Sequence, residues 1–319
     1  MARDPEDEGT PDLFDISPMR RGMTPTTRRL VQTNSAIIEE DPNTIDFLHS
    51  VLCQAMLPYR DPGEGVREWE RIQRSVSLRI EAGTILDPKS KHFVKVGLPY
   101  GEKPRLVLIH LSTEAVRTGS PIIDVGDSMT AYVKSLGIDP NGRNINTLKE
   151  QLTRLAAARV QLGVFQGEHA LQVDTKFVKA FDIWFPKDER QRVLWPTTVR
   201  LSDEYFTSLK DHAVPLDHRA VAALAHSAMS LDLYCWLAQR LFRINDRKSV
   251  LVPWPALQDQ FGSGFARLRK FREKFLPMLR SVLAVYPDAQ VEADGRGLML
   301  RQSRPPVSPL MIAVRKPVE

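Results

Sequence analysis

The sequence predicts an α+β, helix-rich protein with tandem winged-helix domains and a disordered N-terminal arm. Two observations lead to this prediction. The order of helix, turn, helix and β-hairpin occurs twice along the 319-residue chain, and the first 44 residues are polar without hydrophobic periodicity. We therefore expect a disordered arm at 1–44, an N-terminal winged-helix domain at 45–192, a C-terminal winged-helix domain at 193–302 and a loose tail at 303–319.

The arm is rich in Asp, Glu, Pro, Thr and Arg, and such a segment cannot bury enough apolar surface to fold. One apolar island, Asp12 to Ile16, interrupts it. This island is either chance sequence or a short linear motif that binds a partner protein.

The N-terminal domain shows helical and strand periodicities in the winged-helix order. Apolar residues at helical spacing (Ile45, Leu48 and Leu52) predict its first helix, and alternation from Val76 to Ile80 predicts its first strand. We expect helices at 44–56, 103–118, 127–136 and 146–159, and strands at 75–82, 93–96, 160–165, 172–177 and 181–185, with 93–96 as the hairpin partner of 75–82.

The C-terminal domain repeats the order without obvious residue identity to the first. A tight turn from Asp294 to Gly297 joins its last two strands. We expect helices at 203–210, 217–225, 231–243, 255–260 and 265–283, and strands at 195–201, 250–252, 290–292 and 298–301.

The helix that begins near Phe265 is strongly basic. The chain has a net charge of +5, and the 19 residues from Gly262 to Arg280 contain six basic residues and one acid. An apolar stripe would face the core, and Arg272 at its edge is the one misfit. The stripe consists of Phe265, Leu268, Phe271, Phe275, Leu279 and Val282. Ser263 would cap the helix, which should kink or restart at Pro277. A solvated basic face is the plain alternative, but such faces usually mix signs. The expected DNA-binding residues are Arg267, Arg269, Lys270 and Lys274.

The helix at 146–159 carries fewer charges but side chains of the types that read base edges. Its apolar residues would point inward, and an ordinary polar outer face accounts for the same pattern. The candidates for base contacts are Arg143, Asn146, Thr147, Gln151 and Arg154. Lys149 is the candidate for a phosphate contact. Arg296 lies at the tip of the last hairpin, where it could contact the DNA backbone or the minor groove.

Several function classes lack their sequence signals. There is no phosphate-binding loop of the G-x-x-x-x-G-K-[ST] type, and no two histidines have a metal-ligand spacing, so we expect no catalysis, metal or cofactor. No apolar run could span a membrane and no signal peptide is present, so we expect a cytoplasmic protein. Cys53 and Cys235 lie in apolar surroundings and are expected to be buried, inert thiols.

Several short runs, in order, resemble the RepA-type plasmid replication initiators, the family of plasmid-encoded RepA proteins. The resemblance covers roughly residues 45 to 300. The runs are Leu98-Pro99-Tyr100-Gly101, Pro104-Arg105, Ser112-Thr113-Glu114-Ala115-Val116, Ser128, Leu136-Gly137, Leu201-Ser202, Phe206, Pro215-Leu216-Asp217, Leu231-Asp232-Leu233-Tyr234-Cys235-Trp236-Leu237 and Arg240.

The resemblance implies an initiator that is not an enzyme. Such proteins bind direct repeats (iterons) in double-stranded plasmid origin DNA, open the duplex and recruit the host initiator ATPase and replicative helicase. They often repress their own promoter as homodimers. Asp12-Leu13-Phe14 resembles part of a sliding-clamp motif, without its usual glutamine. Two alternatives stay open, a winged-helix transcriptional repressor without a replication role and a nicking initiator that uses Tyr132 or Tyr234.

Overall fold

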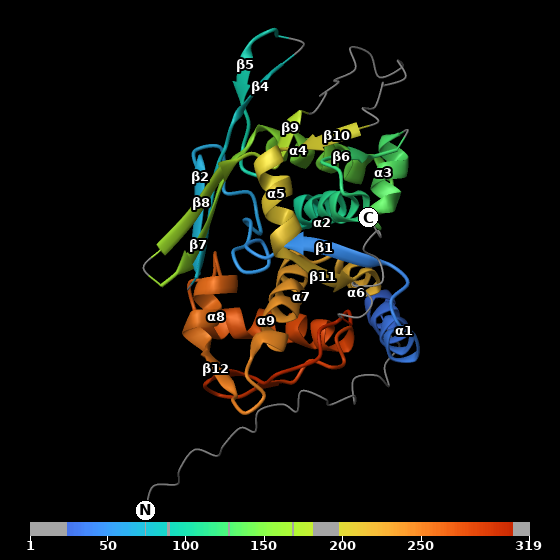
Figure 1. Cartoon of the computed structure of the whole chain (residues 1–319), viewed down its shortest axis with the longest axis vertical. Coiled ribbons are helices and arrows are strands. Elements are labelled where there is room, and N and C mark those ends of the chain that lie inside the picture. The colour runs from blue at the N-terminus through green and yellow to red at the C-terminus, as the bar shows by residue number, and fades with distance from the viewer. Residues whose placement is uncertain are drawn as a thin grey trace, which may run out of the picture.

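The computed structural model describes residues 24–308, except for 74, 88–89, 127, 168 and 181–197. The fold mixes helices and antiparallel strands, and its elements stack along the long axis of the molecule (Figure 1). One group, built mainly from residues 45–212, lies at the upper end in this view. The other, built mainly from residues 213–300, lies at the lower end.

The upper group contains a four-stranded antiparallel sheet of order β2-β3-β7-β8. Its strands are β2 (Glu68–Gln73), β3 (Val76–Glu81), β7 (Arg159–Gln166) and β8 (His169–Thr175). On β3 buried residues alternate with half-buried ones, so one face of the strand packs on the core. The same group contains the helices α2 (Glu102–Thr118), α3 (Met129–Ser135), α4 (Gly142–Ala157) and α5 (Asp203–His212), of which α5 packs against β8 and α3 against α4.

Two smaller sheets connect distant parts of the chain. In the first, of order β6-β10-β9, the middle strand β10 (Thr198–Leu201) lies between β6 (Ile122–Asp124) and β9 (Val178–Ala180). In the second, β1 (Ile45–His49) pairs with β11 (Ala213–Asp217). Elements that we assign to the C-terminal domain therefore pair with strands of the N-terminal domain. The domain boundary at residue 193 stays a prediction.

The lower group begins with α6 (His218–Leu224), α7 (Ala228–Arg240) and a 3-10 turn, Leu241–Arg243. Strand β12 (Val250–Pro253), helix α8 (Trp254–Phe261) and helix α9 (Leu268–Ala284) follow, and then strands β13 (Val291–Ala293) and β14 (Gly297–Leu300). The three strands form an antiparallel sheet in which β14 lies between β12 and β13.

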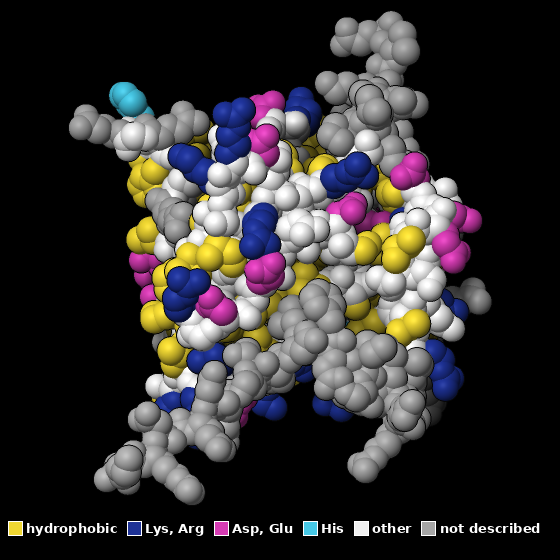
Figure 2. All heavy atoms as spheres, turned by 90° about the horizontal axis from the view of Figure 1, so that it is seen from below, with side chains coloured by type: hydrophobic (Ala, Val, Ile, Leu, Met, Phe, Trp, Pro, Cys, Tyr) yellow, Lys and Arg dark blue, Asp and Glu magenta, His cyan; other side chains and the backbone are white. Residues whose placement is uncertain are grey.

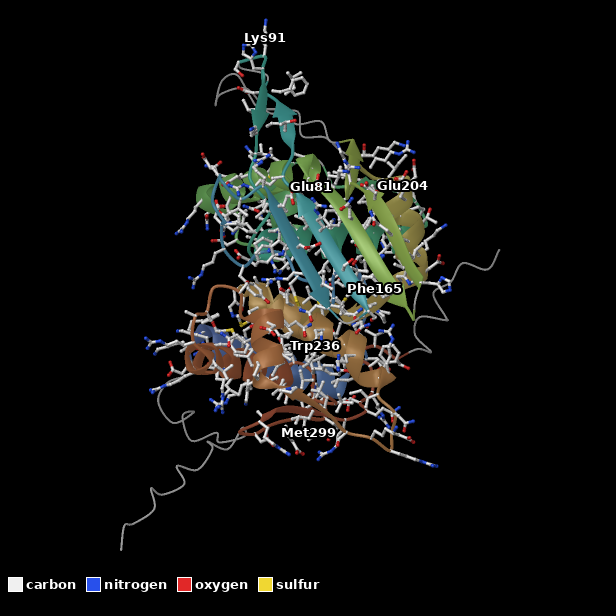
Figure 3. The ribbon with its side chains drawn as sticks, turned by 90° about the vertical axis from the view of Figure 1, so that its left-hand side faces the viewer. Glu81, Lys91, Phe165, Glu204, Trp236 and Met299 are labelled. Carbon is white, nitrogen blue, oxygen red and sulfur yellow. The ribbon has the colours of Figure 1, made fainter. Side chains whose placement is uncertain are left out.

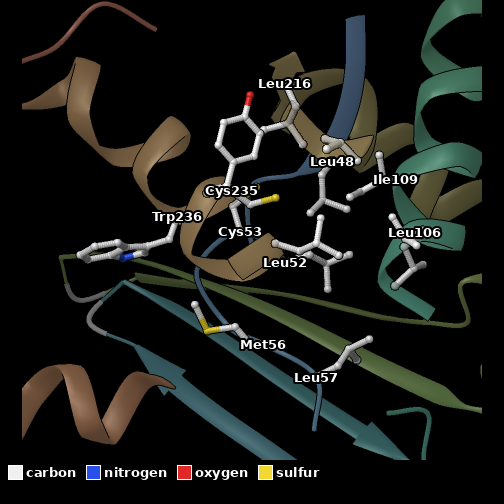
Figure 4. Close-up of a cluster of buried hydrophobic side chains, with 14 of the residues drawn as sticks. Leu48, Leu52, Cys53, Met56, Leu57, Leu106, Ile109, Leu216, Cys235 and Trp236 are labelled. Atoms are coloured by element: carbon white, nitrogen blue, oxygen red, sulfur yellow. The ribbon is translucent and has the colours of Figure 1, made fainter. Parts of the chain in front are cut away.

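One continuous hydrophobic core joins the two groups. Leu52 and Met56 of the segment after β1, Ile109 of α2, and Cys235 and Trp236 of α7 meet in it (Figure 4). Cys53 and Cys235 are both buried, with exposed fractions of 0% and 2%, and neither forms a disulfide. The prediction of buried thiols is confirmed.

A fifteen-residue helix, α1 (Pro25–Glu39), occupies most of the described part of the predicted arm. Thr24 caps it, Leu30 is buried and the Asn34 amide donates to the Ala284 carbonyl oxygen at 2.7 Å. The prediction of disorder is therefore wrong for residues 25–39, because a few apolar contacts and side-chain hydrogen bonds to α6 and α9 fix a segment of polar composition. Residues 1–23, and with them Asp12 to Ile16, lie outside the described residues.

Two other predictions are wrong. Residues 45–49 form strand β1 rather than a helix, because their apolar spacing also suits a strand buried on both faces and pairing with β11 decides between the two. The segment Phe93–Lys95, β5, pairs with β4 (Thr84–Leu86) rather than with β3, whose two edges are taken by β2 and β7.

The remaining predicted elements within the described residues are confirmed to within a few residues at their ends. The predicted strand at 181–185 and most of the tail lie outside the described residues. The first residues of the tail, including the buried Ser303 and Val307, contact the body. No helix in the described part of the chain is long and apolar enough to cross a membrane.

Candidate nucleic-acid interface

Helix α9 is held in the core by one apolar face. Phe271, Phe275, Leu279 and Val282 are fully buried, at the spacing of one helix stripe. The Phe275 ring contacts Trp254 and Phe261 of α8, with centroids 5.9 and 5.6 Å apart. These aromatic contacts anchor α9 to the core and leave its opposite face toward solvent.

The opposite face of α9 is cationic, as predicted. Arg267, Arg269, Lys270 and Lys274 are all exposed. Glu273 pairs with two of them, since Arg269 Nε lies 3.1 Å and Lys270 Nζ 2.8 Å from its carboxylate oxygens. These hydrogen bonds, first that from Lys270, lower the pKa of Glu273. Arg267 and Lys274 form no ion pair with any described residue, so their charges are available to a ligand.

The start of α9 differs from the prediction. The helix begins at Leu268 with Arg267 at its N-cap position, so Ser263 does not cap it. Arg272, the misfit at the edge of the apolar stripe, lies over the Trp254 ring at 4.7 Å and is explained by a cation–π contact. The helix continues through Pro277 to Ala284 without a restart, and a kink there stays a prediction.

The lower face of the molecule carries other basic side chains. Figure 2 shows Lys and Arg spread over this face among apolar and acidic side chains. In the β13–β14 turn, the Arg296 side chain is exposed and pairs with Asp294, with Nη2 2.9 Å from Oδ2. Asp294 also accepts from the Arg296 and Gly297 amides, which fixes the turn. Arg296 is thus at a hairpin tip, as predicted, but already has a carboxylate partner.

Helix α4 exposes only part of its predicted set. Asn141 caps the helix by accepting from the Asn144 amide at 2.9 Å, and its apolar residues pack inward. Arg143 and Asn146 are exposed, and Lys149 is half-buried. Thr147 is half-buried as well, and its hydroxyl donates to the Arg143 carbonyl oxygen at 2.9 Å.

Gln151 is buried rather than on the outer face of α4, so its predicted placement is wrong. Arg154 is half-buried, and its predicted base contact stays a prediction. Gln151 is 1% exposed, and its Oε1 accepts from the Tyr100 amide at 2.8 Å. Arg154 donates to the Leu98 carbonyl oxygen at 3.0 Å and pairs with Asp61 and Glu150. Both side chains hold the segment before α2 against α4, a contact that helical periodicity cannot reveal.

A groove of about 640 Å³ lies between α4 and the β4–β5 hairpin. Asn146 and Lys149 line it from α4, and Lys95 and Arg67 line it from the other side. Its lining also includes Arg154 and three acidic residues, Asp61, Glu64 and Glu150. Lys95 and Arg67 are not among the residues predicted from the sequence. For Lys95 the available signal is the cluster of lysines around Lys91, which the expected pairing of 93–96 with 75–82 obscured.

The tyrosines of the nicking alternative are both buried. Tyr132 is 2% exposed and Tyr234 is 0% exposed, and burial raises the pKa of each hydroxyl above its ordinary value. The Tyr234 hydroxyl oxygen accepts from the Asp217 amide at 2.9 Å. Neither oxygen is accessible to a DNA phosphate in this conformation. In the described part of the chain, no cluster of His, Cys, Asp or Glu side chains could hold a metal ion.

Comparisons with known proteins give a family and two solved structures. Residues 98–255 match the family model described as "Plasmid encoded RepA protein". No curated protein matches the chain. A crystal structure of selenomethionine derivatives of domains 2 and 3 of RctB is similar over 80% of this chain and 99% of that one, at 12% identity and a TM-score of 0.49. A second structure of RctB domains 2–3 is similar over 78% of this chain and 94% of that one, at 12% identity and a TM-score of 0.46.

Proposed function

Residues 98–255 place the chain in the family of plasmid-encoded RepA proteins, and from this premise we propose that it initiates plasmid replication by binding direct repeats in the origin. The observation that carries the DNA-binding part of this proposal is α9. It is anchored by four buried apolar residues and presents Arg267 and Lys274 without ion-pair partners among the described residues.

We propose that the C-terminal elements are a winged-helix domain. Two features support this. The elements follow the winged-helix order of helix, strand, two helices and two strands, which are α7, β12, α8, α9, β13 and β14. In the sheet, β14 lies between β12 and β13. In this arrangement α9 takes the place of the recognition helix, and the turn that carries Arg296 takes the place of the wing.

The N-terminal elements support a second winged helix with one difference. The order α2, β6, α3, α4, β7 and β8 is similar, but β10 is inserted between β6 and β9, and the β7–β8 hairpin extends the sheet of β2 and β3. We propose α4 as its recognition helix, with Arg143, Asn146 and Thr147 at base edges and Lys149 at a phosphate.

The two proposed recognition helices have different roles. The cations of α9 supply sequence-independent affinity by contacting phosphates, whereas α4 supplies most of the discrimination between sequences. Because α4 and α9 lie toward opposite ends of the long axis, they can contact separate stretches of one repeat (Figure 1). Two linked modules bind such a site more tightly than either alone.

The partners in this proposal are double-stranded origin DNA, the host initiator ATPase and replicative helicase, and a second copy of the chain in a repressing homodimer. A sliding-clamp contact through Asp12 to Phe14 is part of the proposal but lies outside the described residues. We place the protein in the cytoplasm and propose no catalytic activity of its own, in keeping with the buried Tyr132 and Tyr234.

A minimal plasmid tests the proposal. It carries this gene, its flanking DNA and a selectable marker, and we expect it to replicate in a suitable host. An Arg267→Ala/Lys274→Ala double variant should abolish replication, whereas Lys210→Ala, at an exposed lysine of α5, should not. If the wild-type plasmid fails to replicate although the protein binds the flanking DNA, the initiator function is wrong and the repressor alternative is favoured.

A further inference from the structure

The β4–β5 hairpin projects from the upper end of the molecule beside α4, and Lys91 lies at its outer end (Figures 1 and 3). We call residues 84–95 the ribbon. Its apolar side chains are unusually exposed, with Phe93 at 75%, Leu86 at 58% and Val94 at 36%. Exposed apolar groups gathered on one projecting element mark an interaction site.

The root of the ribbon is fixed to the body. The Arg67 guanidinium donates to the carbonyl oxygens of Ala82, Gly83 and Val96 at 2.6, 2.9 and 2.5 Å. The Gly83 backbone approaches the end of α4 so closely that a Cβ there would lie 1.9 Å from the Ala157 carbonyl oxygen. The direction of the ribbon relative to α4 is therefore set before any partner binds, which lowers the entropic cost of binding.

The charge of the ribbon suits a polyanion. The segment 84–96 contains three lysines and one aspartate, a net charge of +2 with its histidine neutral. Lys91 and Lys95 are exposed, and the Asp87 carboxylate accepts from the Ser90 amide inside the turn. Lys95 lines the same groove as Asn146 and Lys149 of α4, so a ligand that reaches Lys95 also lies beside α4. The charged lining of this groove is mixed, with Arg67 and Arg154 as further bases and Asp61, Glu64 and Glu150 as acids.

We propose that the ribbon contacts the duplex that α4 binds, with Lys91 and Lys95 at phosphates and Phe93 and Leu86 against the sugars of the groove wall. A two-stranded ribbon has the width that the DNA major groove admits. This contact extends the binding site beyond the reach of α4 itself. The inference rests on the proposed function, because it takes duplex DNA as the ligand of α4.

A tethered DNA-cleaving reagent tests where the ribbon lies. Cys53 and Cys235 are buried, so Ser90→Cys places one reactive thiol at the ribbon end and Ala266→Cys places one beside α9. Each variant of the full chain is labelled with iron–EDTA and bound to duplexes that the wild-type chain selects from a random-sequence pool. We expect both tethers to cut, each at its own fixed position in the selected sequence.

The outcomes separate this inference from the proposed function. If only the Ala266→Cys tether cuts the DNA, the ribbon contact is wrong and the proposal of DNA binding by α9 is unaffected. Failure of the selection and of both tethers would overturn both proposals.

The salt dependence of binding gives an independent readout. Lys91→Ala/Lys95→Ala should lower the slope of log K against log salt by about two units, and Lys210→Ala should leave it unchanged. An unchanged slope in the double variant, with no cutting from Ser90→Cys, would overturn the inference.

Discussion

Gln151 is a case in which one hydrogen bond decides the role of a residue. The side chain is of a type that reads adenine, and on a helical wheel it lies with Asn146 on the polar face of α4. In the structure its oxygen accepts from the Tyr100 amide at 2.8 Å while the side chain is 1% exposed. Asn146 is exposed and lines the groove. Two similar amides on one helix therefore have different expected roles.

Gln151→Ala should lower the free energy of unfolding by about 1–3 kcal/mol, because it leaves the half-buried Tyr100 amide without its acceptor. Asn146→Ala should leave stability unchanged and reduce discrimination between selected and random duplexes by about 1–3 kcal/mol. Urea denaturation and competition binding measure the two effects. Loss of discrimination without loss of stability in Gln151→Ala would return this residue to the DNA-binding set.

His49 gives a pH dependence of stability. It is buried, its Nδ1 accepts from the Val51 amide at 3.2 Å and Ser208 Oγ lies 2.9 Å from Nε2. Burial, with a smaller effect of His212, lowers its pKa to about 3. Because the unfolded chain takes up a proton below pH 6.5 and the folded chain does not, stability is lost as the pH falls from 6.5 toward 3.

The His49 contribution to this loss approaches about 1.4 kcal/mol per pH unit. We expect His49→Gln to remove that part of the slope in denaturation curves measured between pH 6.5 and 4.5, whereas His169→Gln, at an exposed histidine, should retain it. Equal slopes in all three proteins would show that His49 does not stay neutral in the folded state.

At the scale of elements, local pattern predicted those helices whose apolar stripe faces the core. The stripe of α9 is an example, since Phe271, Phe275 and Leu279 were assigned to the buried face from spacing alone and are buried. Where pairing with a distant strand determines the secondary structure, the local sequence pattern does not predict it. Residues 45–49 have spacing that suits a helix, and only β11, more than 160 residues away, selects the strand. The ordering of α1 likewise depends on hydrogen bonds to Ala222 and Ala284.

The docking of α1 can be tested with two adjacent residues. Leu30 is buried and Val31 is 37% exposed. We expect Leu30→Asp to detach the helix, because it places a carboxylate in an apolar contact, so that the amides of residues 29–39 exchange rapidly with deuterium. Val31→Asp should keep their protection. Equally slow exchange in both variants would mean that α1 does not depend on the Leu30 contact.

At the scale of the whole molecule, the two groups of elements are joined by buried charge as well as by apolar packing. Arg105 of α2 forms two hydrogen bonds of 2.7 Å with Asp232 of α7, and its remaining donors reach carbonyl oxygens of Leu57, Pro58 and Gly101. This contact crosses the predicted domain boundary. It joins α2 of the upper group to α7 of the lower group.

The salt dependence of DNA binding tests the central claim, that the cationic face of α9 binds phosphates, most directly. Lys270 shares Glu273 with Arg269, so its removal should have a smaller effect than removal of the unpaired Arg267 and Lys274. We predict that Arg267→Ala/Lys274→Ala lowers the slope of log K against log salt by about two units, with the melting temperature unchanged. Lys210→Ala should keep the wild-type slope. A wild-type slope in the double variant would contradict the account.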